Sequence, residues 1–345
     1  MNTKKRNPQC AACGNLNTQK WGSRNGLKRY RCEQGHAFSI DFRPKPKLLG
    51  AYLAGPSVRN IAAESGLKKS AIAEHLKREL SALPQNELIT KAYCTRFGGV
   101  LCVDGVYLRV RGHEMMPFIS GIDFITHDVP AGIIDFAESG VAFERLFNIL
   151  KEVGYPLRYV VADEAPALKP ALRKVFPQAE VQLCQVHVLR NIRKTLHVTT
   201  KDESHLPFFR NIQELFRMAG ETNRRTFFLE LTHSQSLKDG EWEILKSIRS
   251  RWDDLFRFES IRKEGLACPR DNNLSEAYNQ HFQSRMSGIK GFETISSAER
   301  FVNAWTIRRR FTPFRACGEH FKHLNGKTPF SQSRNPDLPY PDILL

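Results

Sequence analysis

The feature that most constrains the fold is a pair of apolar segments that each end in an aspartate. The segment VLCV, residues 100–103, runs into Asp104, and RYVVA, residues 158–162, runs into Asp163. If both are strands of one sheet, their ends can bring the two carboxylates together, where they repel unless a divalent cation neutralises them. Oxygen ligands of this kind suit Mg²⁺ or Mn²⁺. Each aspartate alone could equally cap a turn or a helix, but the pair favours a metal site.

The segments around these aspartates alternate between strand and helix patterns. Alternation at 106–110 and the run PFISGIDF predict two more strands after the first. Helical periodicity follows at 141–153 and 165–175, and VQL at 181–183 predicts a last strand. Three strands, a helix, a strand, a helix and a strand is the order of a ribonuclease H-like core, an α/β fold with a mixed sheet.

The rest of the chain is helical and then rich in proline. From about 188 to 265 the pattern is almost purely helical, and 272–310 predicts further helices with many cations. From Pro329 on, we expect a poorly ordered tail.

The charge of the chain indicates a polyanionic partner. The 345 residues include 52 Lys and Arg against 36 Asp and Glu, a net charge of +16, which favours nucleic acid. An acidic membrane surface would need an apolar anchor or a basic amphipathic helix. We find no apolar run of about 18 residues and no apolar secretory core at the N-terminus. We therefore expect a cytoplasmic protein with no membrane association.

Three of the eight cysteines stand near the start of the chain, beside a histidine. Cys10 and Cys13 form a C-x2-C pair, and Cys32 is followed by His36. Three thiolates and an imidazole complete a tetrahedral Zn²⁺ site, and so small a segment would hardly fold without metal. Chance clustering of thiols is the alternative. The segment resembles the zinc ribbons of insertion-sequence transposases, with His36 in place of a cysteine, and FRPKPK after it predicts a linker.

A second DNA-binding element is predicted at 47–83. In SVRNIAAESGLKKSAIAEHLKREL, two helical patterns flank Ser65-Gly66, and Ser70 can cap the second helix. The segment resembles a helix-turn-helix of the resolvase and insertion-sequence type, with a recognition helix at about 69–80. An ordinary pair of packed helices is the alternative. The candidate DNA contacts are Lys68, Lys69, Ser70, His75 and Lys77.

Two further motifs follow the second aspartate. LCQVHVLRN holds Cys184 and His187 in a C-x-x-H spacing, which puts both on one face of a helix. A buried cysteine and a core histidine are the alternative. In RDNNLSEAYNQHFQSR, Asn272 or Asn273 can cap a helix with Glu276 in its first turn, where the helix dipole alone could also explain a glutamate. The cations that follow could track a DNA backbone or simply face solvent; they are Arg285, Lys290, Arg300, Arg308, Arg309 and Arg310.

Together these motifs resemble the Mutator-like family of insertion-sequence and eukaryotic-element transposases. The resemblance rests on VDGVYLRV, on VVADEAPALKPALRKVFPQAEVQLCQVHVLRNI and on NNLSEAYNQHFQSR, and it covers roughly residues 98–310. It implies a catalytic triad of Asp104, Asp163 and Glu276, with Cys184 and His187 as the family's C-x-x-H. Three nearby carboxylates compete with Glu276 for the third place: Glu264, Asp271 and Glu293.

The resemblance also implies a ribonuclease H-like catalytic domain that holds two Mg²⁺ or Mn²⁺ ions in each active site. An all-helical insertion would interrupt this domain at about 190–268. Trp242 or Trp252 in the insertion could stack on a base flipped out of DNA. A tryptophan packed in a helical core is the alternative.

The predicted organisation is multidomain α/β. It comprises a zinc-ribbon-like domain at 1–43, the helix-turn-helix at 47–83, the catalytic domain at 98–310 and a tail at 311–345. We predict a DNA transposase that binds the terminal inverted repeats of a mobile element, cuts the DNA and joins it to target DNA. Pairing of two element ends implies a homodimer or a larger assembly on DNA. In a prokaryote, we expect the protein to associate with the nucleoid. The alternatives are a domesticated DNA-binding regulator and a metal-dependent nuclease without joining activity.

Overall fold

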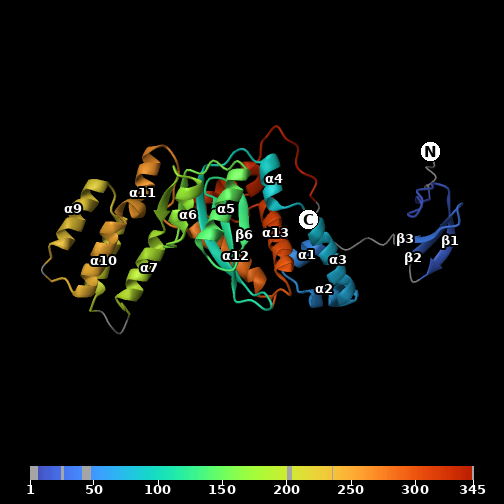
Figure 1. Cartoon of the computed structure of the whole chain (residues 1–345), viewed down its shortest axis with the longest axis horizontal. Coiled ribbons are helices and arrows are strands. Elements are labelled where there is room, and N and C mark those ends of the chain that lie inside the picture. Colours follow the sequence, from blue (N-terminus) through green and yellow to red (C-terminus); the bar gives the residue numbers. More distant parts are fainter. Residues whose placement is uncertain (1–6, 25–26, 41–47, 200–203, 235, 344–345) are drawn as a thin grey trace. The chain divides into compact units, whose positions relative to one another are not determined.

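A computed structural model describes residues 7–24, 27–40, 48–199, 204–234 and 236–343, and it divides the chain into two compact units, Met1–Lys47 and Leu48–Leu345. The FRPKPK segment predicted to be a linker lies outside the described residues. The first unit is a three-stranded antiparallel sheet in the order β1-β2-β3 (Figure 1). Its strands are β1 (Thr18–Arg24), β2 (Leu27–Cys32) and β3 (Ala37–Ile40). Its small apolar content includes one stacked ring pair, Tyr30 on Phe38.

The second unit is built on a five-stranded mixed sheet, which confirms the predicted mixed α/β fold. Its strands are β4 (Val100–Leu108), β5 (Met116–Asp123), β6 (Ala131–Ile134), β7 (Tyr159–Ala162) and β8 (Glu180–Leu183). The order across the sheet is β6-β5-β4-β7-β8. Strands β4, β5 and β6 are antiparallel neighbours, while β4, β7 and β8 run parallel.

The segmentation of the first strands differs from the prediction. Residues 100–103 and 106–108 belong to one continuous strand, β4, so Asp104 lies within a strand and not at its end. The third strand is the short β6, whose sequence AGII gave too little periodicity to identify. The overall order of three strands, helix, strand, helix and strand is nevertheless the one expected.

One face of this sheet is covered by helices α5 (Gly140–Glu152) and α6 (Leu168–Val175), close to the helices predicted at 141–153 and 165–175. Side chains alternate along β4, so Leu101 and Val103 face these two helices, while Val100 and Cys102 face the opposite side. On that opposite side the sheet is covered partly by helices of the predicted insertion and partly by the late helices α12 (Asn273–Met286) and α13 (Ile295–Phe311).

The predicted insertion is helical, with five helices among its described residues: α7 (Gln185–Thr195), α8 (Leu206–Arg217), α9 (Glu221–Thr232), α10 (Asp239–Ser250) and α11 (Trp252–Lys263). An aromatic cluster fills its core, where Trp252 contacts Phe228 and Phe256 with ring centroids 5.1 and 4.7 Å apart. The insertion returns to the sheet through α11, because the Gln182 amide of β8 bonds the backbone of Leu255 and Phe258.

The helix-turn-helix segment consists of α1 (Leu48–Ala54), α2 (Val58–Ser65) and α3 (Lys69–Ala82), followed by α4 (Asn86–Tyr93). Gly66 ends α2 in the left-handed conformation that glycine adopts at low cost. The expectation that Ser70 caps the next helix is wrong, because α3 begins at Lys69 with Lys68 at the cap position. Leu53, Ile61 and Ile72 join the same apolar cluster as α12 and α13, so these three helices pack on the core.

The chain ends with α12 (Asn273–Met286), α13 (Ile295–Phe311), the 3₁₀ helix η1 (Glu319–Leu324) and α14 (Pro329–Ser333). The expectation of a poorly ordered tail from Pro329 is wrong for α14. Phe330 is fully buried, and the Ser333 hydroxyl donates to Asp128 over 2.5 Å. Among the described helices, none is both long and apolar enough to cross a lipid bilayer.

Candidate functional site

The register of the sheet brings the two predicted aspartates together. Strands β4 and β7 pair in parallel, with Val103 opposite Ala162, so the next residues along are Asp104 and Asp163. Asp104 is fixed by its own strand and by α12. Its Oδ1 accepts the Gly105 N–H at 2.8 Å, and its Oδ2 accepts the Asn279 side-chain amide at 2.8 Å.

Asp163 meets the C-x-x-H motif and the predicted glutamate. His187 Nδ1 lies 2.7 Å from Asp163 Oδ1, and its Nε2 lies 3.4 Å from Glu276 Oε1. The same Nδ1 shares a hydrogen bond of 3.2 Å with Cys184 Sγ. Cys184 and His187 stand at the cap and the first turn of α7, which is the shared face that their spacing predicts. The imidazole thus lies between the two carboxylates.

Helix α12 carries Glu276 to the site because two asparagines tie this helix to β4. Asn272 occupies the N-cap position, but its side chain does not cap the helix as the sequence suggested. It donates to the Val103 carbonyl at 2.8 Å, while its backbone N–H points to Cys184 Sγ at 3.2 Å. Two turns later, Asn279 holds Asp104. Glu276 lies between these anchors, in the first turn.

The site concentrates negative charge. Burial and the neighbouring Asp163 carboxylate raise the pKa of Asp104 from its ordinary 3.8 to about 6. Burial, followed by the charges of Glu276 and Glu138, raises the pKa of Asp163 to about 6, against a smaller opposite effect of Arg190. Shifts in this direction mean that the folded protein disfavours the ionised carboxylates while no cation is present.

Glu138 is a fourth carboxylate that sequence analysis missed. It stands in the loop before α5, next to the cap residue Ser139, where no periodicity draws attention to it. A Cβ atom on Gly105 would fall 2.2 Å from Glu138 Oε1, so the Glu138 carboxylate occupies the space that a side chain at this position would take. Its charge raises the pKa of both Asp104 and Asp163.

The other carboxylates that competed with Glu276 have their own bonds. Glu264 accepts from Arg158 at 3.0 Å and from Tyr159 at 2.7 Å. Glu293 pairs with Arg111 and is 78% exposed, and Asp271 accepts the Asn273 N–H at 3.2 Å. Of these candidates, Glu276 is the one that raises the pKa of Asp163 and contacts His187.

The chemistry of the donor set fits a hard divalent cation. Two buried carboxylate oxygens, Asp163 Oδ1 and Glu276 Oε1, receive no hydrogen bond from any described group, although His187 is close to both. A buried, unsatisfied carboxylate oxygen is costly. A Mg²⁺ or Mn²⁺ ion would satisfy these oxygens and offset the repulsion between the carboxylates.

The N-terminal unit gathers the four predicted zinc ligands. The ligand atoms of Cys10, Cys13, Cys32 and His36 all lie within 4.8 Å of one another. Cys13 Sγ is 3.8 Å from Cys32 Sγ, and Cys32 Sγ is 3.5 Å from His36 Nδ1. A tight turn follows Cys10, where the Gly14 N–H donates to the Cys10 carbonyl, and another follows Cys32, where the Gly35 N–H donates to the Cys32 carbonyl. The arrangement fits a tetrahedral Zn²⁺ ion.

The candidate DNA contacts of the helix-turn-helix differ in solvent exposure. Lys68, Lys69, Ser70 and Lys77 are exposed. His75 is half-buried and engaged within α3, where it lies 3.1 Å from Glu79 and 2.8 Å from Arg78.

The later candidates also separate by burial. Lys290 is exposed, whereas Arg285 is buried. The expectation that Arg310 could track DNA is wrong, because it is fully buried and bonded to Asp128. Trp242 is 43% exposed, while Trp252 is buried in the core of the insertion, the alternative considered for it.

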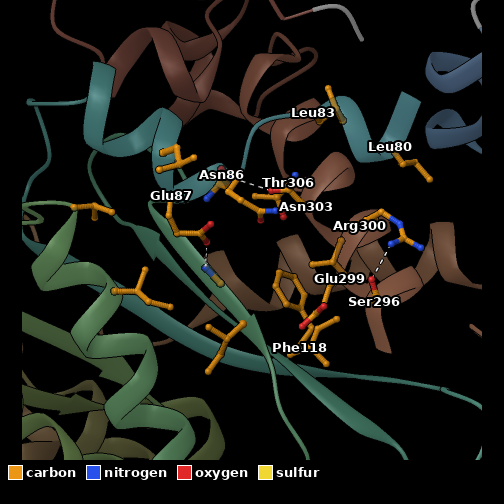
Figure 2. A pocket seen from close by; sticks show the side chains of 18 of the residues that line it. Leu80, Leu83, Asn86, Glu87, Phe118, Ser296, Glu299, Arg300, Asn303 and Thr306 are labelled. Carbon is orange, nitrogen blue, oxygen red and sulfur yellow. Dashed lines mark hydrogen bonds between the residues drawn. The ribbon is translucent and has the colours of Figure 1, made fainter. Parts of the chain in front are cut away.

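A large cavity of about 790 Å³ lies elsewhere, between α4, β6, α5 and α13 (Figure 2). Its charged lining is balanced, since Glu87, Glu152 and Glu299 face Lys91, Arg145 and Arg300. The Asp104, Asp163 and Glu276 carboxylates do not line it, so it is separate from the site described above.

Comparisons with known proteins place the chain among the DNA transposases. A transposase for insertion sequence element IS256 in transposon Tn4001 of Staphylococcus aureus is 26% identical over 299 residues, which cover 81% of this chain and 75% of the relative. A transposase for insertion sequence element IS1201 of Lactobacillus helveticus is 24% identical over 242 residues, covering 68% and 62%. The chain belongs to the Mutator family of transposases, whose model matches residues 47–310.

Among solved structures, the chain is similar to the Drosophila P element transposase strand transfer complex. The TM-score is 0.33 at 10% identity, with 84% of this chain and 91% of the other chain covered. At so low a score the likeness supports no assignment of fold or residue role.

Proposed function

We propose that this transposase cuts and joins DNA at a site formed by Asp104, Asp163 and Glu276, and that its five-stranded sheet is a ribonuclease H-like core. The observation that carries the proposal is the convergence of these three carboxylates from β4, the end of β7 and α12. Two Mg²⁺ or Mn²⁺ ions held there would activate the attacking oxygen and stabilise the leaving oxygen. Phosphoryl transfer needs little further covalent chemistry from the protein, because positioning and electrostatics supply most of the catalysis.

The chain's own residues would set the geometry of this site. Asn279 holds one oxygen of Asp104, which leaves the carboxylate in a single orientation. His187 lies against both Asp163 and Glu276, and Cys184 limits how the ring can turn. The ligand atoms of Asp163, Cys184 and His187 lie within 4.8 Å of one another, so the motif and this carboxylate share one site. We infer that the C-x-x-H motif positions the second and third carboxylates.

The remaining parts would bring DNA to the site. We propose that Cys10, Cys13, Cys32 and His36 hold one structural Zn²⁺ and that residues 1–83 bind the terminal inverted repeats. Within that region, the exposed Lys68, Lys69, Ser70 and Lys77 are the candidate contacts. Pairing of two element ends would need at least a homodimer. Because the curated relatives include bacterial insertion-sequence transposases, we place the protein in the cytoplasm, at the nucleoid.

A strand-transfer assay tests the reaction class. Pre-cut element ends, with target plasmid and Mg²⁺ or Mn²⁺, should give joined products by gel electrophoresis. A plain nuclease would degrade or nick these substrates without joining them. A regulator without catalytic activity would bind the ends and leave them uncut. Either outcome would overturn the proposed joining activity.

A further inference from the structure

A second cluster of charge lies beyond the other end of α12. There, a cavity of about 460 Å³ opens between the end of α1, the last turns of α12 and the C-terminal part of α13. Four arginines line it, and we call it the arginine pocket: Arg285, Arg308, Arg309 and Arg315. His281 lines it too, and no described lining residue is acidic.

Arg285 is built into the wall of the arginine pocket and is only partly satisfied. It is 6% exposed, and its Nη2 donates to the Tyr52 carbonyl of α1 at 2.5 Å. Its Nε and Nη1 find no hydrogen-bond acceptor among the described residues. A buried donor without an acceptor costs free energy, and more so when it is charged. The wall of the pocket therefore holds a positive charge that is incompletely paired, which favours an anion beside it.

A neighbouring arginine shows what full pairing looks like in this fold. Arg310 donates from Nε and Nη2 to the two oxygens of Asp128, at 2.8 and 2.7 Å. Arg309, one residue earlier on α13, has no described acceptor for its Nε and lies 4.9 Å from the Phe314 ring. Burial lowers the pKa of both Arg285 and His281, and the nearby charges of Arg308 and Arg309, respectively, act in the same direction.

The planar donors of guanidinium groups match the oxygens of a phosphate. The arginine pocket and Glu276 share α12, so they lie roughly 14 Å apart along the helix at about 1.5 Å per residue. That length is on the order of four base pairs of B-DNA, at about 3.4 Å for each phosphate of one strand. The wall formed by α1 also joins the pocket to the helix-turn-helix.

We propose that the arginine pocket binds one backbone phosphate of the element-end DNA and so fixes the register of the strand that enters the carboxylate site. The proposal rests on the DNA-binding function proposed above. It adds a specific phosphodiester contact that depends on Arg285, Arg308 and Arg309, between the helix-turn-helix and the site of cleavage.

The test is a double-mutant cycle between protein charge and single phosphates. Duplexes carry the element end with one neutral methylphosphonate at each backbone position in turn, and their affinity is measured for the full-length chain by fluorescence anisotropy. With wild-type protein, one position should weaken binding by about tenfold, as expected for loss of a charge-assisted hydrogen-bonded contact. With Arg309→Gln, and separately Arg308→Gln, that same position should weaken binding by less than about twofold.

Arg300→Gln is the matched control. It removes the same charge from the same helix, but Arg300 lines the other cavity and bonds Ser296 (Figure 2). In this variant, a methylphosphonate at the sensitive position should still weaken binding by about tenfold. If each methylphosphonate weakened binding by Arg308→Gln and by Arg309→Gln as much as it weakens binding by the wild type, the arginine pocket would not be the phosphate site. The proposed DNA-binding function would still stand. Absence of DNA binding by the wild type would instead refute the function on which the pocket depends.

Discussion

Removing one carboxylate should stabilise the folded protein when divalent cations are absent. In Asp104→Asn, the backbone N–H of Gly105 keeps its acceptor. Asn279 Oδ1 has no hydrogen-bond partner among the described groups, so a flip of the Asn279 amide lets it accept from the side-chain amide that the substitution introduces. The flip gives up the weak 3.5 Å bond from Asn279 Nδ2 to the Gly105 carbonyl, while the substitution removes the charge repulsion. We expect a higher melting temperature than that of the wild type in buffer free of Mg²⁺ and Mn²⁺.

The magnitude follows from the pKa of Asp104, which rises from 3.8 to about 6 on folding. Each pKa unit corresponds to about 1.4 kcal/mol, so the ionised carboxylate costs roughly 3 kcal/mol before solvent screening. Because the side chain is half-buried, we discount this to about 1–2 kcal/mol. At about 2–4 °C for each kcal/mol in a unit of this size, the expected rise is about 2–8 °C.

Because folding raises the pKa of Asp104, the stabilisation expected for Asp104→Asn depends on pH. Between about pH 4 and 6 the folded chain retains a proton that the unfolded chain has released, so the metal-free wild type loses stability as pH rises through that window. Asp104→Asn lacks this loss of stability, so the melting temperatures of the two proteins should diverge between about pH 4 and 6. Differential scanning fluorimetry at pH 4, 5, 6 and 7.5 measures it, with Glu293→Gln as an exposed carboxylate control. A melting temperature at pH 7.5 below that of the wild type would refute the repulsion.

Three further predictions concern other parts of the chain. Purified protein should contain about one Zn²⁺ per chain by elemental analysis, lost in Cys10→Ser and in Cys32→Ser; a zinc-free wild type with a folded N-terminal unit would contradict the site. Lys69→Ala with Ser70→Ala should reduce the preference of the full chain for element ends over random duplex, measured by competition binding, whereas Arg111→Ala should not; equal discrimination by both would remove the recognition role of α3. Glu138→Gln should shift the lower limb of the pH–rate profile of cleavage to lower pH, because its charge raises the pKa of Asp104 and Asp163; an unchanged profile would show that this carboxylate does not act on the site.

The two aspartates were predictable because strand geometry relates sequence to position directly. Apolar runs that end at Asp104 and Asp163 predict strands, and parallel pairing of β4 with β7 then places the two carboxylates side by side. Strand β6 was missed because four residues, AGII, carry too little periodicity. Its place depends on Gly132, where a Cβ would fall 2.7 Å from the Phe118 ring, a contact that only tertiary structure reveals.

The rest of the site depends on contacts between segments far apart in sequence. Glu138 lies in a loop, and its carboxylate fills the space beside Gly105 on β4. Three successive arginines end α13, and composition alone could not show that Arg310 turns inward to Asp128 while Arg308 and Arg309 line a cavity. Successive residues on a helix point about 100° apart, so their surroundings differ completely. Asn272 likewise reads as a helix cap, but it binds β4.

The central claim is that Asp104, Asp163 and Glu276 act as one metal-binding unit. The most direct measurement is cleavage of a labelled element end in Mg²⁺ or Mn²⁺, with DNA binding measured in parallel. Asp104→Asn, Asp163→Asn and Glu276→Gln should each keep end binding and lose cleavage by roughly 10²–10⁴-fold or more, with no further loss on combination. The control substitutions Asp271→Asn and Glu293→Gln should retain substantial activity. Full cleavage by Asp163→Asn, or wild-type cleavage by Glu276→Gln with loss in a control, would contradict the site as described.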